Sequence, residues 1–142
     1  MKVLLDTCVV VDVLQKREPF YQNAMDIFLA ISNRELEGVL TAKSLTDIYY
    51  ILRRSLHNEM ETRKYLKTLF ILFDVEDTFS IDCQLALQSQ MKDYEDAIMV
   101  ETALRIGVDC IVTRNIKDYA LAKIPVLSPE QLIEQLKNQN DV

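Results

Sequence analysis

The sequence has one histidine, three cysteines and no tryptophan among its 142 residues. A single histidine, His57, argues against metal sites built from several histidines, and a Ser-His-Asp triad would have to use it. The cysteines are far apart and never form a CxxC pair, so the pattern indicates neither a disulfide framework nor a thiolate zinc site. We therefore expect the cysteines to be small buried residues and His57 to lie at the surface, between two helices.

Long hydrophobic runs are also missing. No apolar stretch approaches the roughly 20 residues that span a bilayer, and Asp6 interrupts the opening MKVLLDTCVV too early for a signal peptide. The length is that of one ordinary domain, which can bury a core without disulfides or metal ions as staples. We expect a soluble, cytoplasmic protein with no membrane contact.

Glycine is rare, and its two positions are informative. Gly38 and Gly107 each follow a helical pattern and precede a short apolar run, which is typical of a helix C-cap before a strand. Ser128 and Pro129 suit the N-cap and first turn of the last helix, and we expect the residues after that helix to be frayed. Hydrophobic periodicity predicts strands at 2–5, 38–41, 74–77, 109–113 and 125–127, and helices at 7–15, 19–35, 43–56, 59–73, 80–90, 94–106, 115–121 and 129–138.

This alternation of short apolar strands with helices predicts an α/β fold. The sheet should be mostly parallel, contain four to five strands and be covered by helices on both faces. In open sheets of this kind, ligands bind beyond the carboxyl ends of the strands. Polar residues that directly follow a strand are therefore the candidate functional residues.

At this edge of the predicted sheet the sequence supplies mainly acids. Strand ends and helix starts carry acidic or amide side chains at Asp6, Asp47, Asp96, Asn115 and Asp118. Clustered carboxylates are costly to ionise without a cation, because each negative charge raises the pKa of its neighbours. Mg²⁺ and Mn²⁺ prefer oxygen ligands, and they can activate water and neutralise phosphate charge. The pattern therefore favours metal-dependent hydrolysis of phosphodiesters.

The net charge of −6 works against binding a phosphate backbone. Metal ions held by the acids would reduce that repulsion. Four basic residues are candidate contacts for backbone phosphates, although each fits a solvated surface charge better: Lys43, Arg54, Arg114 and Lys117.

The sequence resembles the PIN-domain family of metal-dependent nucleases, which includes the VapC-type toxins of toxin–antitoxin systems. The matching segments, in order across nearly the whole chain, are VLLDTCVVVDVL, REPFYQNA, SLTDIYYILRR, DYEDAIMVETALRIGVDCIVTRNIKDY and IPVLSPEQLI. The resemblance implies a three-layer α/β/α sandwich that forms one nuclease domain over residues 1–142, binds Mg²⁺ or Mn²⁺ and cuts RNA. It also implies a separately encoded antitoxin and a homodimer.

The resemblance assigns roles to individual acids. Asp6 and Asp96 match two acids of the family. Asp47 stands where the family usually has Glu, so its shorter side chain would reach a metal ion through water. Asn115 stands where the family often has Asp, and either Asn115 or Asp118 would complete the ligand set.

Three further residues are candidate supports of the acids. The hydroxyl of Thr7 would steady Asp6, or Thr7 would be the N-cap of the first helix. Asp93 lies one turn before Asp96 and would be either a helix N-cap or a group behind the metal ligand. Thr113 ends the fourth strand and is the third support. We expect Asp12, nearly two helical turns beyond Asp6, to lie outside the site.

Two other functions fit parts of the pattern. A catalytically weakened PIN-fold module that binds RNA or protein would result if Asp47 and Asn115 made the metal site too weak. A phosphoryl-transfer enzyme with an aspartyl phosphate at Asp6 would normally have a second acid two residues later, where this sequence has Cys8. The first alternative stays open, and the second is disfavoured.

Overall fold

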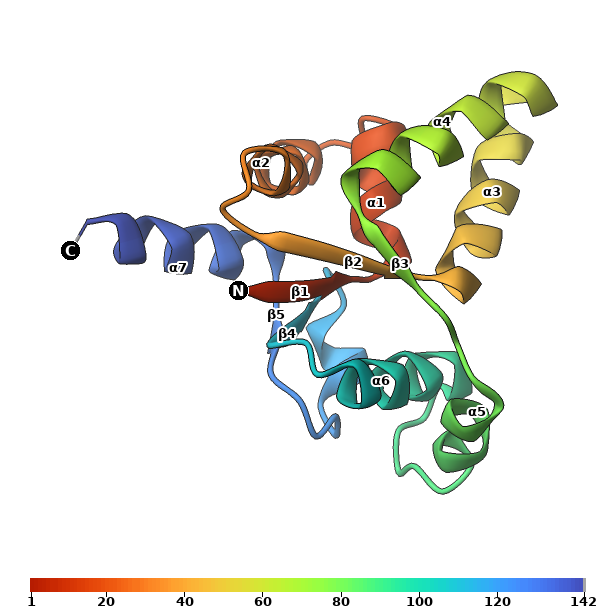
Figure 1. Ribbon diagram of the computed structural model, residues 1–142, viewed down its shortest axis with the longest axis vertical. Coiled ribbons are helices and arrows are strands. Elements are labelled where there is room, and N and C mark those ends of the chain that lie inside the picture. Colours follow the sequence, from red (N-terminus) through yellow and green to blue (C-terminus); the bar gives the residue numbers. More distant parts are fainter. Residues whose placement is uncertain (142) are drawn as a thin grey trace.

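The computed structural model describes residues 1–141 and has a five-stranded sheet with helices on both faces (Figure 1). The strand order is β3-β2-β1-β4-β5, and all neighbouring strands are parallel. This confirms the predicted three-layer α/β/α fold. The elements are β1 (Lys2–Leu5), α1 (Thr7–Leu14), α2 (Tyr21–Ser32), β2 (Glu37–Thr41), α3 (Ala42–Leu56), α4 (Glu59–Leu72), β3 (Asp74–Glu76), α5 (Ser80–Ala86), α6 (Tyr94–Ile106), β4 (Cys110–Val112), the 3-10 helix η1 (Ile116–Tyr119), β5 (Val126–Leu127) and α7 (Pro129–Asn140).

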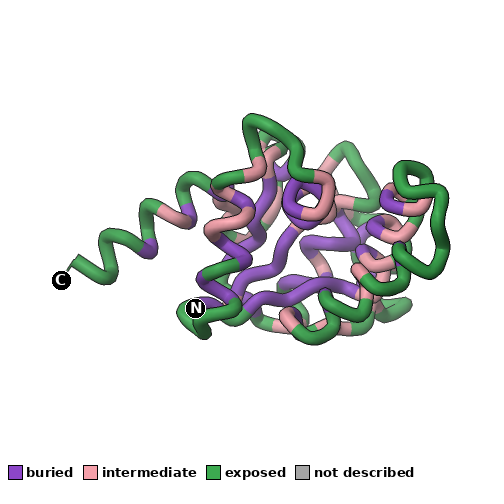
Figure 2. Tube along the Cα trace, turned by 90° about the horizontal axis from the view of Figure 1, so that it is seen from above, coloured by how far each residue is buried: buried purple, intermediate pink, exposed green. Residues whose placement is uncertain are grey.

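The two faces of the sheet bury different residues because side chains alternate along each strand. In β1, Val3 and Leu5 belong to the core beneath α1, α2, α3, α4 and α7, whereas Leu4 packs with Met99 and Val100 of α6 on the other face. Figure 1 shows α1 to α4 on one side of the sheet and α5 and α6 on the other. The three central strands β2, β1 and β4 are buried on both faces, as the purple centre of Figure 2 shows, whereas the edge strands β3 and β5 are partly exposed.

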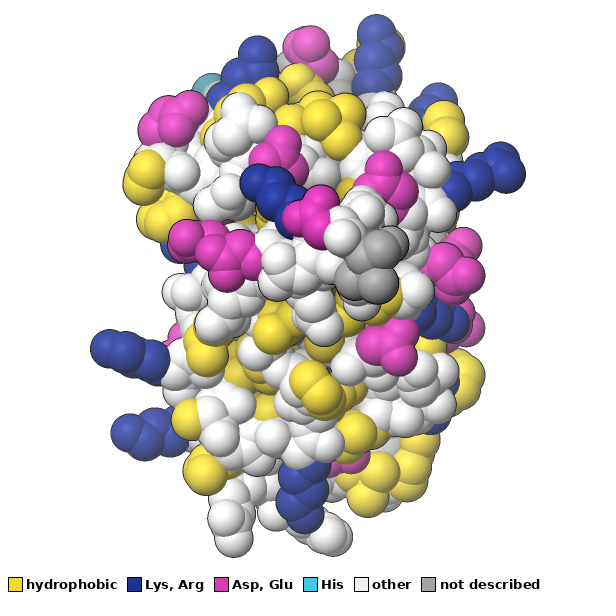
Figure 3. Space-filling view, turned by 90° about the vertical axis from the view of Figure 1, so that its left-hand side faces the viewer, with side chains coloured by type: hydrophobic (Ala, Val, Ile, Leu, Met, Phe, Trp, Pro, Cys, Tyr) yellow, Lys and Arg dark blue, Asp and Glu magenta, His cyan; other side chains and the backbone are white. Residues whose placement is uncertain are grey.

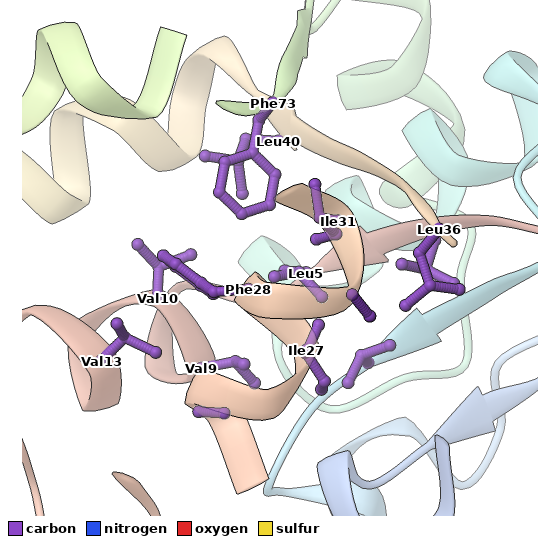
Figure 4. Packing of buried hydrophobic residues seen from close by; sticks show 14 of the residues in the cluster. Leu5, Val9, Val10, Val13, Ile27, Phe28, Ile31, Leu36, Leu40 and Phe73 are labelled. Carbon is purple, nitrogen blue, oxygen red and sulfur yellow. The ribbon is translucent and has the colours of Figure 1, made fainter. Parts of the chain in front are cut away.

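The larger core lies between α1, α2 and the sheet (Figure 4). The α1 valines, Ile27 and Ile31 interdigitate over Leu5, and the rings of Phe28 and Phe73 meet edge to face with centroids 5.2 Å apart. Burial of each of these side chains contributes about 1.5 to 3 kcal/mol relative to exposure. This packing fixes α1 on the sheet and so fixes the position of its first residues at the end of β1.

The two glycines have different roles, and the prediction for Gly38 was wrong. Gly107 is the C-cap of α6 with φ of 82°, as expected. Gly38 lies inside β2, while α2 ends at Ser32. A Cβ at Gly38 would lie 2.6 Å from Ile31 and 2.7 Å from the Phe73 ring, so glycine is required there by close packing.

Several predicted element boundaries also change. Helix 19–35 is shorter in the structure, helix 80–90 ends at Ala86, and the short helix at 115–121 is the 3-10 helix η1. Ser128 caps α7 as expected, but the helix continues to Asn140 through residues that we expected to be frayed. Val142 lies outside the described residues. Among residues 1–141, no helix has both the length and the apolar character needed to cross a bilayer.

Candidate active site

Asp6 lies at the end of β1 and is the N-cap of α1, so Thr7 is not the N-cap. Its Oδ1 accepts a hydrogen bond from the Thr7 backbone N–H at 2.8 Å, and its Oδ2 accepts one from the Thr113 hydroxyl at 2.8 Å. The Cys8 thiol donates to Oδ2 at 3.8 Å. Burial raises the pKa of Asp6, and the bonds from Thr113 and Thr7 offset part of that effect. These hydrogen bonds therefore hold the Asp6 carboxylate at the edge of the sheet where the strands end, which we call the rim.

Asp96 lies in the first turn of α6 and faces the same rim. Asp93 is the N-cap of α6, and its Oδ1 accepts a hydrogen bond from the Asp96 N–H at 3.0 Å. Burial, followed by repulsion from Asp6 and Asp93, raises the pKa of Asp96 to about 6, and the charge of Asp118 adds to the effect. Ionisation of both acids is thus costly, because two carboxylates that repel each other are brought together at this edge of the sheet.

Tyr119 is a site residue that the sequence did not single out. Its hydroxyl donates to Asp96 Oδ1 at 3.2 Å, and the side chain is only 3% exposed. The bond lowers the pKa of Asp96 and partly counters the repulsion. A buried tyrosine needs a partner for its hydroxyl. Tyr119 is the last residue of the segment RNIKDY, directly after the candidate Asp118, and this position was the signal in the sequence.

Asp47 lies on α3 and lines the same cleft as Asp6 and Asp96, which has a volume of about 320 Å³. Its carboxylate accepts a hydrogen bond from Lys43 Nζ at 2.9 Å, and the same ammonium lies 3.7 Å from Glu95. Burial by itself would lower the pKa of Lys43, but the hydrogen bond and charge of Asp47 and the charge of Glu95 outweigh it and raise that pKa. The Lys43 ammonium therefore already occupies one side of this cleft, which we call the acidic cleft.

Asn115 and Asp118 do not line the acidic cleft in this structure. Asn115 precedes η1 and lines a separate hollow beside Arg114. Asp118 is exposed in η1 and lines another hollow with Asp93 and Lys117. Asp118 acts on Asp96 through its charge. Of the two residues left open by the sequence, Asp118 thus has an electrostatic link to the cleft.

The four candidate RNA contacts have different surroundings. Lys43 is inside the cleft, Arg54 is exposed over the Tyr50 ring at 5.6 Å, and Lys117 lies in the hollow beside Asp118. Arg114 is paired with Asp12 by two hydrogen bonds of 2.6 and 3.2 Å. Figure 3 shows the side of the molecule where β1 begins, opposite the acidic cleft at the end of β1, and acidic and basic side chains are both present there.

The acidic cleft therefore combines one lysine with four carboxylates, those of Asp6, Asp47, Glu95 and Asp96. Within residues 1–141, no group of three or more Asp, Glu, His or Cys side chains has the arrangement of a formed metal site. Lys43 pairs with Asp47 and lies 3.7 Å from Glu95, so among residues 1–141 Asp6 and Asp96 are the two carboxylates of the cleft without a basic partner. The arrangement suits a hard cation that uses one or two direct carboxylates and keeps its waters.

The sequence profile of the PIN domain matches residues 2–117 of this chain. The match covers most of the sequence, so the chain belongs to the PIN-domain family, as its motifs indicated. No curated protein sequence matches the chain significantly.

Solved structures of toxin–antitoxin proteins share the fold. VapBC2 from Rickettsia felis, bound to a DNA fragment from their promoter, has a TM-score of 0.68 at 16% identity, over 90% of this chain and 98% of that chain. A toxin–antitoxin complex from Klebsiella pneumoniae has a TM-score of 0.65 at 24% identity, over 89% and 97%. VapC20 from Mycobacterium tuberculosis, a toxin that cleaves the sarcin-ricin loop, has a TM-score of 0.62 at 9% identity, over 77% and 86%. At these identities the likeness establishes the fold.

Proposed function

We propose that this protein is a metal-dependent endoribonuclease and the toxin of a toxin–antitoxin pair. The observation that carries the proposal is the pair Asp6 and Asp96. Both carboxylates line one cleft at the carboxyl end of the sheet, and the pKa of each is raised in the metal-free protein. Groups with perturbed pKa values in a cleft are typical of functional sites. Membership of the PIN-domain family supports the same reaction.

Asp6 and Asp96 are the residues that would hold Mg²⁺ or Mn²⁺, with Asp47 acting directly or through water. Their oxygen ligands suit these hard cations, and a bound cation would remove the repulsion that raises the pKa of Asp96. When bound, the ion supplies an activated water and neutralises charge on the scissile phosphate. Thr113 and Tyr119 hold the two carboxylates in place by donating hydrogen bonds to them.

An antitoxin is the partner that we propose. The solved structures of this fold from Rickettsia felis and Klebsiella pneumoniae are themselves toxin–antitoxin complexes. On α3 and α4 the chain leaves several large apolar side chains exposed, which suits protein contact with an antitoxin or with a second copy. They are Tyr50, Leu56, Met60, Phe70 and Ile71.

The direct test is cleavage of RNA by the purified protein. We expect structured and single-stranded RNAs to be cut when Mg²⁺ or Mn²⁺ is present and to stay intact when EDTA removes the ion. The products can be read by denaturing gel electrophoresis. RNAs that stay intact in both metals, over a range of metal concentrations and RNA types, would rule the proposed activity out.

The weakened binding module stays a second candidate because residues 1–141 contain no formed group of three metal-ligating side chains. Calorimetric titration with Mn²⁺ separates the two functions. A nuclease should bind the ion with a measurable heat that disappears in Asp6→Asn. A module that has lost catalysis should give no heat up to millimolar Mn²⁺.

Lys43→Met is expected to strengthen Mn²⁺ binding, because the ammonium now competes with the ion for Asp47. The pair is partly exposed, and such pairs contribute about 0.2 to 1 kcal/mol, so we expect an affinity gain of about 1.4- to 5-fold in calorimetry. Lys67→Met, on an exposed position of α4, is the matched control and should leave the affinity unchanged. Weaker binding in Lys43→Met would mean that Lys43 assists the ion.

A further inference from the structure

A second hollow lies at the same edge of the sheet, on the side of β4 away from the acidic cleft. Its volume is about 340 Å³, and its wall includes Phe20, Asn23, Arg114 and Asn115, so we call it the Phe20 pocket. It shares no lining residue with the acidic cleft. Thr113, the residue directly before Arg114, donates to Asp6. The pocket is therefore one residue along the chain from a group that contacts the proposed catalytic carboxylate.

The buried carboxylate of Asp12 fixes Arg114 in the wall of the Phe20 pocket. The Arg114 guanidinium lies 4.1 Å from the centroid of the Phe20 ring, and it is fixed by two hydrogen bonds to Asp12, whose side chain is fully buried. These bonds use Nε and Nη2 of Arg114. Among the hydrogen bonds of residues 1–141, none uses Nη1. Phe20 remains 40% exposed.

Two amides complete the recognition chemistry. Asn23 and Asn115 both line the pocket, and neither side-chain amide has a hydrogen-bond partner within residues 1–141. An amide can donate two hydrogen bonds and accept others. The pocket thus presents an aromatic ring, a planar cation and two unpaired amides.

We propose that the Phe20 pocket binds one nucleobase of single-stranded RNA, from a nucleotide next to the phosphate in the acidic cleft. The inference rests on the proposed ribonuclease function. Splayed bases stack on aromatic rings and on arginine guanidinium planes, and amides read their edges. Glu130 also lines the pocket, and its negative charge disfavours a phosphate there. The volume lies near the lower end of the range for small-molecule sites, which suits a single base.

The chain contains a matched control for this arrangement. Arg105 lies 4.0 Å from the centroid of the Phe79 ring and is paired with the buried Asp82, which repeats the geometry around Phe20. Arg105 is nine residues beyond Asp96 on α6, about 14 Å along the helix axis. A change at Phe79 therefore removes the same kind of contact far from the proposed RNA path.

The experiment measures binding of fluorescently labelled single-stranded RNA by anisotropy, in Ca²⁺ and in EDTA. A set of oligonucleotides carries one abasic residue at each position in turn, which removes a base and keeps its phosphate. For the wild type we expect one position where the abasic residue weakens binding by about 5- to 100-fold. Phe20→Leu should lose a similar factor on intact RNA and become insensitive at that position. Phe79→Leu should behave as the wild type.

Equal sensitivity of the wild type and Phe20→Leu to every abasic position would overturn the pocket, as would the absence of a sensitive position. Thermal melts check that the variants fold, and Asn23→Ala gives a second test without loss of the ring. Cleavage of intact RNA in Mn²⁺ is measured separately. If one abasic position weakens binding but no RNA is cleaved, the base-binding pocket is supported and the ribonuclease function is rejected. If RNA is cleaved but no abasic position weakens binding, the ribonuclease function is supported and the pocket is rejected.

Discussion

Asp96→Asn is expected to abolish RNA cleavage and, at the same time, to stabilise the metal-free protein. Asn keeps the shape of the side chain and can still accept the hydrogen bond from Tyr119. It removes the charge that would bind the ion. Loss of groups behind a metal ligand costs 10- to 100-fold in activity, so loss of a ligand charge should lower the cleavage rate by at least about 100-fold.

The stability gain follows from the pKa of Asp96. Its carboxyl has a pKa of about 6 in the folded chain against an ordinary value of 3.8, chiefly because of burial and the charge of Asp6. The folded state therefore binds the proton more tightly, and the free energy of unfolding falls as pH rises from about 4 to about 6. Because Asp96 is only half-buried, solvent reduces the effect, and we expect the ionised carboxylate to lower the free energy of unfolding by about 1 to 2 kcal/mol at neutral pH. Asn removes this effect.

Two measurements on the same variant check this prediction. Cleavage is followed by gel electrophoresis in Mn²⁺, and the midpoint of thermal unfolding is followed by circular dichroism in EDTA from pH 4 to pH 7.5. The melting midpoint of the variant should exceed that of the wild type above pH 6, and the difference should shrink toward pH 4. Glu101→Gln, further along α6, should change neither. An active variant, or one that loses stability at neutral pH, would contradict the assignment.

Arg114→Met is expected to destabilise the fold by about 3 kcal/mol. Asp12 is fully buried, and Arg114 is its only ion-pair partner among residues 1–141. Removal of one member of a buried pair typically costs 3 to 5 kcal/mol, because an uncompensated charge stays behind. We expect the lower part of that range, since the Arg114 side chain is 22% exposed. A loss of this size is a large fraction of the 5 to 15 kcal/mol that holds most domains folded.

Urea unfolding measures the loss of stability in Arg114→Met, and two further variants serve as comparisons. Arg63→Met breaks an exposed pair with Glu59 and should cost less than about 1 kcal/mol. Asp12→Asn combined with Arg114→Met should restore part of the loss, because the stranded charge is gone. If Arg114→Met cost no more than Arg63→Met, the Asp12 pair would not be a structural element of the rim.

Local patterns determined most of the fold. The apolar runs of β1, β2 and β4 and the helical periodicity between them require a parallel sheet covered on both faces, and the five parallel strands agree. Gly107 and Ser128 mark helix ends, because each end depends on residues next to it in the chain. Gly38 escaped this reasoning, since its role is set by Ile31 and by the distant Phe73.

The sequence by itself predicted that Asp6, Asp47 and Asp96 gather at one edge of the sheet, and these three line one cleft, whereas Asn115 and Asp118 line other hollows. It was sufficient to indicate the PIN-domain family. Only the tertiary structure decided how those acids are paired. Asp12 with Arg114 and Thr113 with Asp6 are contacts across more than 100 residues, and Tyr119 reaches Asp96 from another element. Such pairings depend on side-chain directions after packing, which no local pattern encodes.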